Sequence, residues 1–216
     1  MYKIDLHTHS TASPDGGLSA GDYRQMLAAG RLDVIAVTDH NTITGAQLLQ
    51  AELGIQIIVG EEISTTTGDL IGLYLTEAIP AGLEAAEAAR RIKAQHGLVY
   101  VPHPFEQVRK GIGSQLEALA AHVDIIEIHN GRSLSPRGNA LAKRWATAQQ
   151  LPGAASSDAH GMHGWGRTYT MVAAVPTAAT LPALLARATY VTARSSLRGA
   201  LYPKANKLRK RLGHGE

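Results

Sequence analysis

Residues 33–59, DVIAVTDHNTITGAQLLQAELGIQIIV, contain the unit that decides the fold. Asp33–Thr38 is a short apolar run rich in β-branched residues, which predicts a buried strand. A helix is predicted from about Thr42 to Leu53, before Gly54, and Ile55–Val59 is the next apolar strand. A strand, a helix and a second strand in close succession favour a right-handed unit with two parallel strands.

The same alternation continues on both sides of this unit. Strands are predicted at 2–6, 33–38, 55–59, 70–75, 98–101, 124–128, 154–157, 169–175 and 190–192, and helices at 19–29, 42–53, 80–95, 115–121 and 136–150. So many units in one domain favour a mainly parallel sheet that closes into a barrel. We therefore predict one α/β domain over residues 1–193 and a basic tail or helix over residues 194–216.

Most of the predicted strands end in residue types that bind metals. The ends carry Asp5-Leu6-His7-Thr8-His9, Asp39-His40, Glu61-Glu62, His103, His129-Asn130 and Asp158-Ala159-His160. In α/β barrels the carboxyl ends of the strands meet at one rim, where active sites form. Six strands that bring such side chains to one rim predict a metal site.

The spacing of two pairs suits a shared ion. In an extended chain, His7 and His9 lie on one side, with their α-carbons ~6.5–7 Å apart. Both imidazoles then reach one ion at ~2.0–2.1 Å, and the same holds for Asp158 and His160. Asp5 and Asp39 are expected to orient imidazoles from outside the ligand set.

The composition limits the kind of site. The chain has no cysteine, so thiolate metal ligands, disulfides and a cysteine nucleophile are excluded. Histidine and carboxylate ligands suit zinc, manganese or iron. No apolar run approaches the ~18 residues of a membrane span, and the N-terminus begins as a strand rather than as a secretory signal. A cytoplasmic location is the expectation.

Several motifs resemble those of the PHP domain, the polymerase and histidinol phosphatase family. They are DLHTHSTASPDGGLS, AVTDHNT, GEEIS, VPHPF, IEIHNGR and SSDAHGMHGWG, spread over residues 2–175. The resemblance implies a distorted (β/α)7 barrel, a site for two or three divalent metal ions, often trinuclear, and hydrolysis of phosphoesters. The substrate would be a small phosphomonoester, a nucleotide or a short oligonucleotide.

Carried over to this chain, the resemblance implies three groups of ligands. His7, His9, Glu62 and Asp158 would hold one ion, Glu62 and His103 a second, and Asp15, His40 and His160 a third. Many relatives have a histidine where this chain has Asp69, in Gly68-Asp69-Leu70. Aspartate is itself a metal ligand, so Asp69 is a candidate for the second ion, although it could equally cap a turn.

Four residues are candidates for the rest of the chemistry. His129 and His163 are candidates for the acid that protonates the leaving group, and Arg132 and Arg167 for contacts to the phosphate. A surface salt bridge is the alternative for each arginine.

Two other functions compete with phosphoester hydrolysis. An amidohydrolase-like C–N hydrolase also uses a His-x-His pair in a barrel, but often with a lysine as the bridging ligand, whereas the bridging candidate here is Glu62. The second competing function is that of a metal-stabilised binding module without catalysis. The basic residues Lys204, Lys207, Arg209, Lys210 and Arg211 could bind nucleic acid, touch anionic lipid or form a solvated helix.

Overall fold

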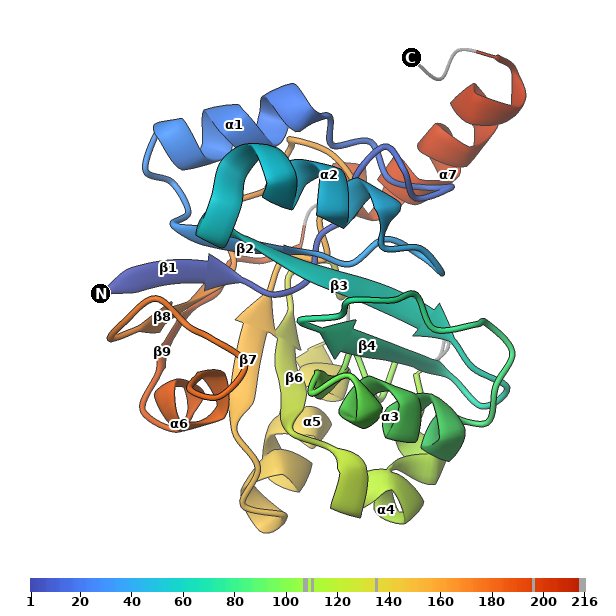
Figure 1. Ribbon diagram of the computed structural model, residues 1–216, viewed down its shortest axis with the longest axis vertical. Helices are drawn as coiled ribbons and strands as arrows, with labels where there is room; N and C mark the ends of the chain where they lie inside the picture. Colours follow the sequence, from blue (N-terminus) through green and yellow to red (C-terminus); the bar gives the residue numbers. More distant parts are fainter. Residues whose placement is uncertain (107–108, 110, 135, 196, 214–216) are drawn as a thin grey trace.

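A computed structural model describes residues 1–216 apart from 107, 108, 110, 135, 196 and 214–216 (Figure 1). One nine-stranded sheet runs in the order β7-β6-β5-β4-β3-β2-β1-β8-β9. The strands are β1 (Tyr2–Asp5), β2 (Val34–Val37), β3 (Ile57–Ser64), β4 (Asp69–Leu73), β5 (Leu98–Val101), β6 (Ile125–Asn130), β7 (Gly153–Ser156), β8 (Tyr169–Val172) and β9 (Thr189–Val191).

Helices surround this sheet, and most of them cover its outer face, whereas the C-terminal one projects away from it (Figure 1). They are α1 (Ala20–Ala28), α2 (Thr44–Leu53), α3 (Ala85–Ala94), α4 (Leu116–Leu119), α5 (Pro136–Ala148), α6 (Leu181–Leu185) and α7 (Leu197–Arg211). The predicted N-cap of α1 is present, because Ser19 and Asp22 form a capping box. No described helix is long and apolar enough to cross a membrane.

The sheet is mixed, whereas the sequence predicted a mainly parallel one. The pairs β1–β2, β2–β3, β5–β6 and β6–β7 are parallel. The pairs β3–β4, β4–β5, β1–β8 and β8–β9 are antiparallel. A short turn joins β3 to β4, and only a helical crossover would have made that pair parallel.

The barrel closes at the rim through the segments that follow β1 and β7. Thr8 and Ala159 form a parallel bridge, the amide of Asp158 donates to the carbonyl of His7 at 2.9 Å, and the amide of His9 donates to Ala159 at 2.9 Å. The main-chain bonds that close the rim therefore also set the spacing of the metal-ligand candidates on either side.

The core has two layers, one inside the sheet and one under the helices. On β2 the alternate residues Val34 and Ala36 face the inner cluster, and Ile35 and Val37 face the outer one. All four residues are buried because both faces of the strand are covered. The structure confirms the predicted α/β class and the nearly closed, distorted barrel.

Candidate metal centre

The candidate ligands come from separate elements and meet at the carboxyl rim of the barrel. His7 and His9 follow β1, Asp15 lies in the loop before α1, and His40 follows β2. Glu62 lies within β3, because that strand continues past its predicted end at Val59. Asp69 begins β4, His103 follows β5, and Asp158 and His160 follow β7.

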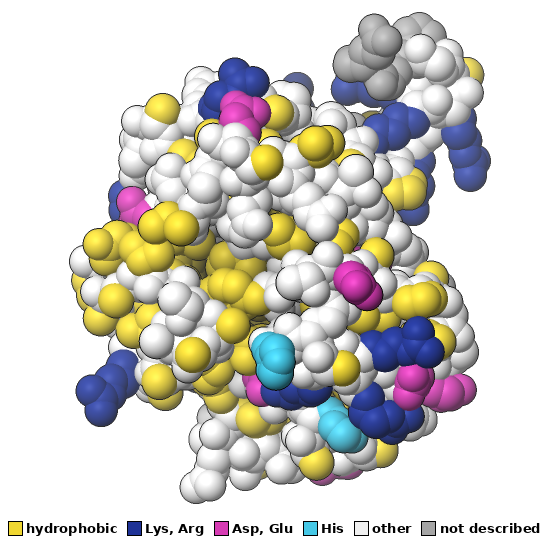
Figure 2. Space-filling view, viewed as in Figure 1, with side chains coloured by type: hydrophobic (Ala, Val, Ile, Leu, Met, Phe, Trp, Pro, Cys, Tyr) yellow, Lys and Arg dark blue, Asp and Glu magenta, His cyan; other side chains and the backbone are white. Residues whose placement is uncertain are grey.

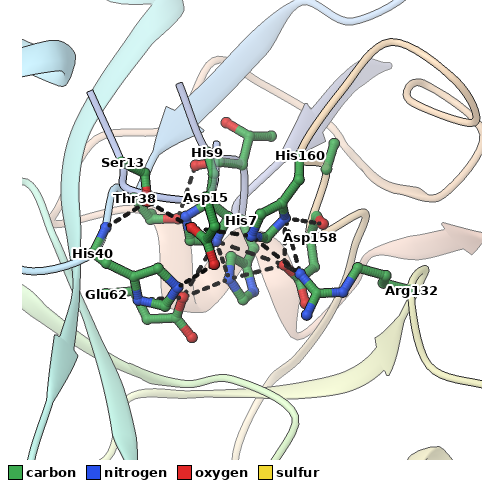
Figure 3. Close-up of polar contacts among 12 residues, drawn as sticks. His7, His9, Ser13, Asp15, Thr38, His40, Glu62, Arg132, Asp158 and His160 are labelled. Carbon is green, nitrogen blue, oxygen red and sulfur yellow. Dashed lines mark hydrogen bonds and ion pairs between the residues drawn. The ribbon is translucent and has the colours of Figure 1, made fainter. Parts of the chain in front are cut away.

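His7, His9, Glu62 and Asp158 form the first cluster (Figure 3). The Nε2 atoms of His7 and His9 lie 3.1 Å apart. Oε2 of Glu62 lies 3.4 Å from the first nitrogen and 3.2 Å from the second. Oδ1 of Asp158 lies 3.7 and 3.6 Å from the same nitrogens. The ligand atoms of His7, His9 and Glu62 all lie within 4.8 Å of one another, and Asp158 adjoins them through the two histidines.

Glu62, Asp69 and His103 form the second cluster. The other carboxylate oxygen of Glu62, Oε1, lies 3.1 Å from Nε2 of His103. The ligand atoms of Glu62, Asp69 and His103 all lie within 4.8 Å of one another. Because its two oxygens face different clusters, Glu62 has the geometry of a bridging ligand.

His9, Asp15, His40 and His160 form the third cluster, with their ligand atoms within 4.8 Å of one another. Oδ2 of Asp15 lies 3.5 Å from Nε2 of His40, and its Oδ1 lies 3.6 Å from Nε2 of His160. The structure therefore brings every predicted metal ligand into one of the three clusters.

These distances fit divalent ions. Ligand atoms bound at ~2.1 Å around a tetrahedral or octahedral ion are ~3.0–3.4 Å apart. The contacts among His7, His9, Glu62 and His103 have that separation, and those of Asp15 in the third cluster are slightly longer, at 3.5 and 3.6 Å. The Nδ1 atoms of His9 and His103 are buried and have no hydrogen-bond partner, although buried polar nitrogens are normally satisfied. Binding through the opposite ring nitrogens would offset this cost.

The carboxylates of the first cluster are ionised despite their burial. Burial opposes the charge of Asp158, but Arg132, His7 and Arg109 hold its pKa well below the usual value. Burial also opposes the charge of Glu62, and the neighbouring His40 and His7 lower its pKa. Both side chains can therefore accept a cation at neutral pH.

Glu127, which sequence analysis missed, holds the imidazole of His7. Oε1 of Glu127 lies 3.1 Å from Nδ1 of His7. Although burial opposes its charge, His7 lowers the pKa of Glu127, and a carboxylate only accepts hydrogen bonds. Nδ1 therefore keeps its proton when His7 is neutral, as a metal ligand must be, and in that state the lone pair of Nε2 is directed at the first cluster.

Asp5 and Asp39 do not orient imidazoles as expected. Oδ1 of Asp5 accepts from the amide of Ser157 at 3.0 Å, and its Oδ2 accepts from Nε1 of Trp165 at 3.2 Å. Asp39 accepts from the amide and the hydroxyl of Ser10 at 2.6 and 2.5 Å. Their role is to hold the loops that carry the ligands.

A β-bulge explains why β6 supplies Glu127 and Asn130 rather than His129. The register with β7 shifts between Glu127 and His129, which breaks the alternation of side chains. Nδ2 of Asn130 donates to Glu127 at 2.8 Å and to Asp158 at 3.1 Å. His129 is half-buried and lies 3.3 Å from Nδ2 of Asn139 on α5.

Two arginines contact the carboxylate of Asp158. Nη1 of Arg132 donates to Oδ1 at 3.0 Å and lies 3.1 Å from Nε2 of His160 (Figure 3). Arg109, which the sequence analysis did not single out, donates to Oδ2 of Asp158 and to Asn130 at 3.2 Å. Arg109 lies among residues with no ligand-like spacing, so only the fold reveals it.

A cavity opens beside the first and third clusters. Its lining includes Arg132, Asp158, His160, His163, Arg167 and Arg194. His163 and Arg167 are exposed at this cavity, so a substrate in it can reach both side chains.

Two candidate ligands have left-handed backbones, which are costly for residues other than glycine. Asp158 has φ of 53° and His103 has φ of 29°. Such conformations persist where the surrounding structure holds them, and they cluster at functional sites.

Comparisons with known proteins identify the family. The PHP domain family matches residues 5–101, and the PHP-associated family matches residues 136–189. An uncharacterized protein of Methanocaldococcus jannaschii is 37% identical over 141 residues, which are 59% of this chain and 81% of that protein. A 5'-3' exoribonuclease of Haemophilus influenzae is 38% identical over 102 residues, 43% of this chain and 37% of that protein.

A solved structure shares the fold. It is a two-domain protein from Bacteroides vulgatus that contains a predicted PHP-like metal-dependent phosphoesterase. The TM-score is 0.70 at 19% identity, over 95% of this chain and 69% of that one. With the geometry of the three clusters, these similarities show that the chain belongs to the PHP domain family of metal-dependent phosphoesterases.

Proposed function

We propose that this protein hydrolyses phosphoesters at a trinuclear metal centre formed by the three clusters. The observation that carries the proposal is the sharing of ligands between clusters. Glu62 faces the first and second clusters with different oxygens, and the third cluster adjoins the first at His9, whose neutral ring would bind one of the two ions. Shared ligands hold ions close together, as a centre that clamps one phosphoryl group requires.

Divalent ions at such a centre supply Lewis acidity towards phosphoryl oxygens and lower the pKa of water. Residues around the candidate ligands hold them in the orientation that this chemistry needs. Glu127 fixes the tautomer of His7, and Asn130 ties Glu127 to Asp158. Manganese, zinc and iron all suit this donor set of imidazoles and carboxylates.

Arginines would neutralise the charge that develops on the phosphoryl group. Arg132 lies at the boundary of the clusters and the cavity, 3.0 Å from Asp158, and Arg167 lines the same cavity. Cations at the edge of a metal site stabilise the spread negative charge of the transition state. Arg109 is a third candidate, because it reaches the opposite oxygen of Asp158.

His163 is the better candidate for the acid that protonates the leaving group. It is exposed and lines the cavity, whereas His129 contacts Asn139 of α5. A His163→Gln variant is expected to lose about 10²–10⁴-fold in kcat on alkyl phosphoesters. It should retain near-normal activity on p-nitrophenyl esters, whose leaving group needs no proton. Equal losses on both substrates would refute this role, and His129→Gln is the matched control.

The experiment that tests the function counts metals and products in one sample. Protein purified without chelator is analysed for its elements and then assayed with added Mn²⁺ against phosphomonoesters, nucleotides and short oligonucleotides. Two or three ions per chain with phosphate release support the proposal. Hydrolysis of amides alone would favour an amidohydrolase, and bound metal without any hydrolysis would favour a binding module.

A nucleic-acid substrate would lie along α7, where basic side chains could bind its phosphates. Figure 2 shows Lys and Arg side chains gathered on this projecting helix. Of the five predicted contacts, Lys204, Arg209 and Arg211 are exposed and unpaired with protein carboxylates in the described contacts, whereas Lys207 and Lys210 approach the loop around Asp15. If these three exposed side chains bind phosphates, replacing them with alanine should make the KM for oligonucleotides less dependent on salt concentration. The salt dependence of the KM for mononucleotides should not change.

A further inference from the structure

The C-terminal helix contributes a buried side chain beside the third cluster. Along α7 most described side chains are exposed, but Asn206 is only 7% exposed. Its Nδ2 donates to the carbonyl oxygen of Asp15 at 2.8 Å and to that of His160 at 2.8 Å. One amide therefore joins the main chains of two residues whose side chains both belong to the third cluster.

Glycines on both loops allow this close approach. A β-carbon at Gly17 would lie 2.7 Å from Nδ2 of Asn206, and one at Gly161 would lie 2.7 Å from the ring of Tyr202 on α7. Real β-carbons essentially never come within 3.0 Å of such atoms. The two loops are therefore shaped to receive α7, one at Asn206 and the other at Tyr202, one turn earlier.

A lysine on the next turn supports the same loop. Nζ of Lys210 donates to the carbonyl oxygens of Thr11 at 2.7 Å and Ser13 at 2.5 Å. The hydroxyl of Ser13 in turn donates to Oδ1 of Asp15 at 2.9 Å. Helix α7 thus contacts the main-chain carbonyl of Asp15 directly, through Asn206. Through Lys210 it also contacts Ser13, whose hydroxyl orients the carboxylate of Asp15.

We propose that Asn206 is a positioning residue for the third metal ion. By tying Asp15 to His160, it sets the separation between the two halves of the third cluster, now 3.6 Å between Oδ1 and Nε2. This inference rests on the proposed function, because it needs the third cluster to hold an ion. It assigns α7 to the metal centre, although none of its side chains is a ligand in the three clusters.

Asn206→Leu tests the inference, since leucine has a similar size and no donors. Equilibrium dialysis against Mn²⁺, followed by elemental analysis, should show one ion bound about 10- to 100-fold more weakly and the others unchanged. Activity should fall in kcat at limiting Mn²⁺ and recover at high Mn²⁺. Leu208→Gln, at a position on the same helix whose side chain is 59% exposed, should change neither.

Asp15→Ala, which removes a candidate ligand, distinguishes the two ways to fail. It should lose the same ion without recovery at high Mn²⁺. If Asp15→Ala loses an ion while Asn206→Leu keeps all of them at normal affinity, the role of Asn206 is refuted and the trinuclear proposal stands. If Asp15→Ala loses none, both are refuted. Should Asn206→Leu not fold, Asn206→Ser retains one donor and is expected to weaken the same ion by a smaller factor.

Discussion

Replacing Glu127 with glutamine tests whether one buried carboxylate controls the first cluster. Oε1 of Glu127 accepts from Nδ1 of His7 at 3.1 Å and from the hydroxyl of Tyr100 at 3.1 Å. Its Oε2 accepts from the amide of His103 at 2.7 Å and from Nδ2 of Asn130 at 2.8 Å. All four partners donate hydrogen bonds. The NH₂ group of a glutamine, in place of either carboxylate oxygen, would therefore face two other donors.

The two orientations of the glutamine have different costs. If its NH₂ faces His103 and Asn130, two buried pairs of donors oppose each other, at about 1–3 kcal/mol each. If it faces His7, the imidazole can accept at Nδ1 by moving its proton to Nε2, and Tyr100 retains Ser156 as a partner at 2.8 Å. The second orientation costs less, but it places a proton where the ion should bind.

Glu127→Gln should therefore weaken metal binding more than it weakens folding. The expected loss is about 10- to 100-fold in affinity for one ion, or about 1.4–2.7 kcal/mol. Titration of the chelator-treated protein with Mn²⁺ in a calorimeter measures it. Glu61→Gln is the matched control, because Glu61 is a buried carboxyl on β3 that instead accepts from the amide of Ile79 at 2.7 Å. Unchanged affinity in Glu127→Gln would refute the tautomer argument.

Two further predictions concern stability. Burial raises the pKa of Glu61 to about 7 from 4.5, so the folded state holds this proton more tightly and the free energy of unfolding should fall as pH rises between these values, by up to about 3 kcal/mol. Urea unfolding of metal-free protein should show Glu61→Gln matching the wild type at pH 4.5 and exceeding it at pH 8; a constant difference would contradict this. Chelation should lower Tm and Mn²⁺ should raise it, by about 2.7 kcal/mol of stability at a concentration of 100 times Kd; a Tm that ignores both would count against a metal centre.

The local parts of the site could be predicted because they depend on short stretches of chain. His7 and His9 are two residues apart on an extended segment, so their common direction follows from strand geometry, and their Nε2 atoms are 3.1 Å apart in the structure. The same reasoning predicted most strands within one or two residues, with β5 at Leu98–Val101 as predicted.

Other features depend on pairing that no local pattern specifies. The sequence predicted that β3 ends at Val59, but the strand continues to Ser64 because β4 pairs with its second half. The alternation along this extension directs Glu62 inward and Glu61 outward, to Ile79. Without the partner strand, strand periodicity does not distinguish the two adjacent glutamates, and only the resemblance to the PHP domain indicated Glu62 as the ligand.

Glu127 was missed for a related reason. It lies among isoleucines in Ile125–Asn130, where the apolar pattern predicts a strand and hides the carboxylate. The bulge after Glu127 then directs Asn130 to the site and leaves His129 at α5. A histidine beside a strand end is a good candidate ligand on residue type alone, but register decides its direction.

The ligands were therefore easier to predict than the residues that hold them in place. A metal ligand must be one of a few residue types, so the sequence displays it, whereas a supporting contact can use any donor or acceptor, including the main chain. Asn206 lies 46 residues beyond His160, and its partners are carbonyl oxygens. Contacts that support the candidate ligands come from β6, α7 and several loops, so the spacing of these ligands depends on the whole chain and not on the motifs alone.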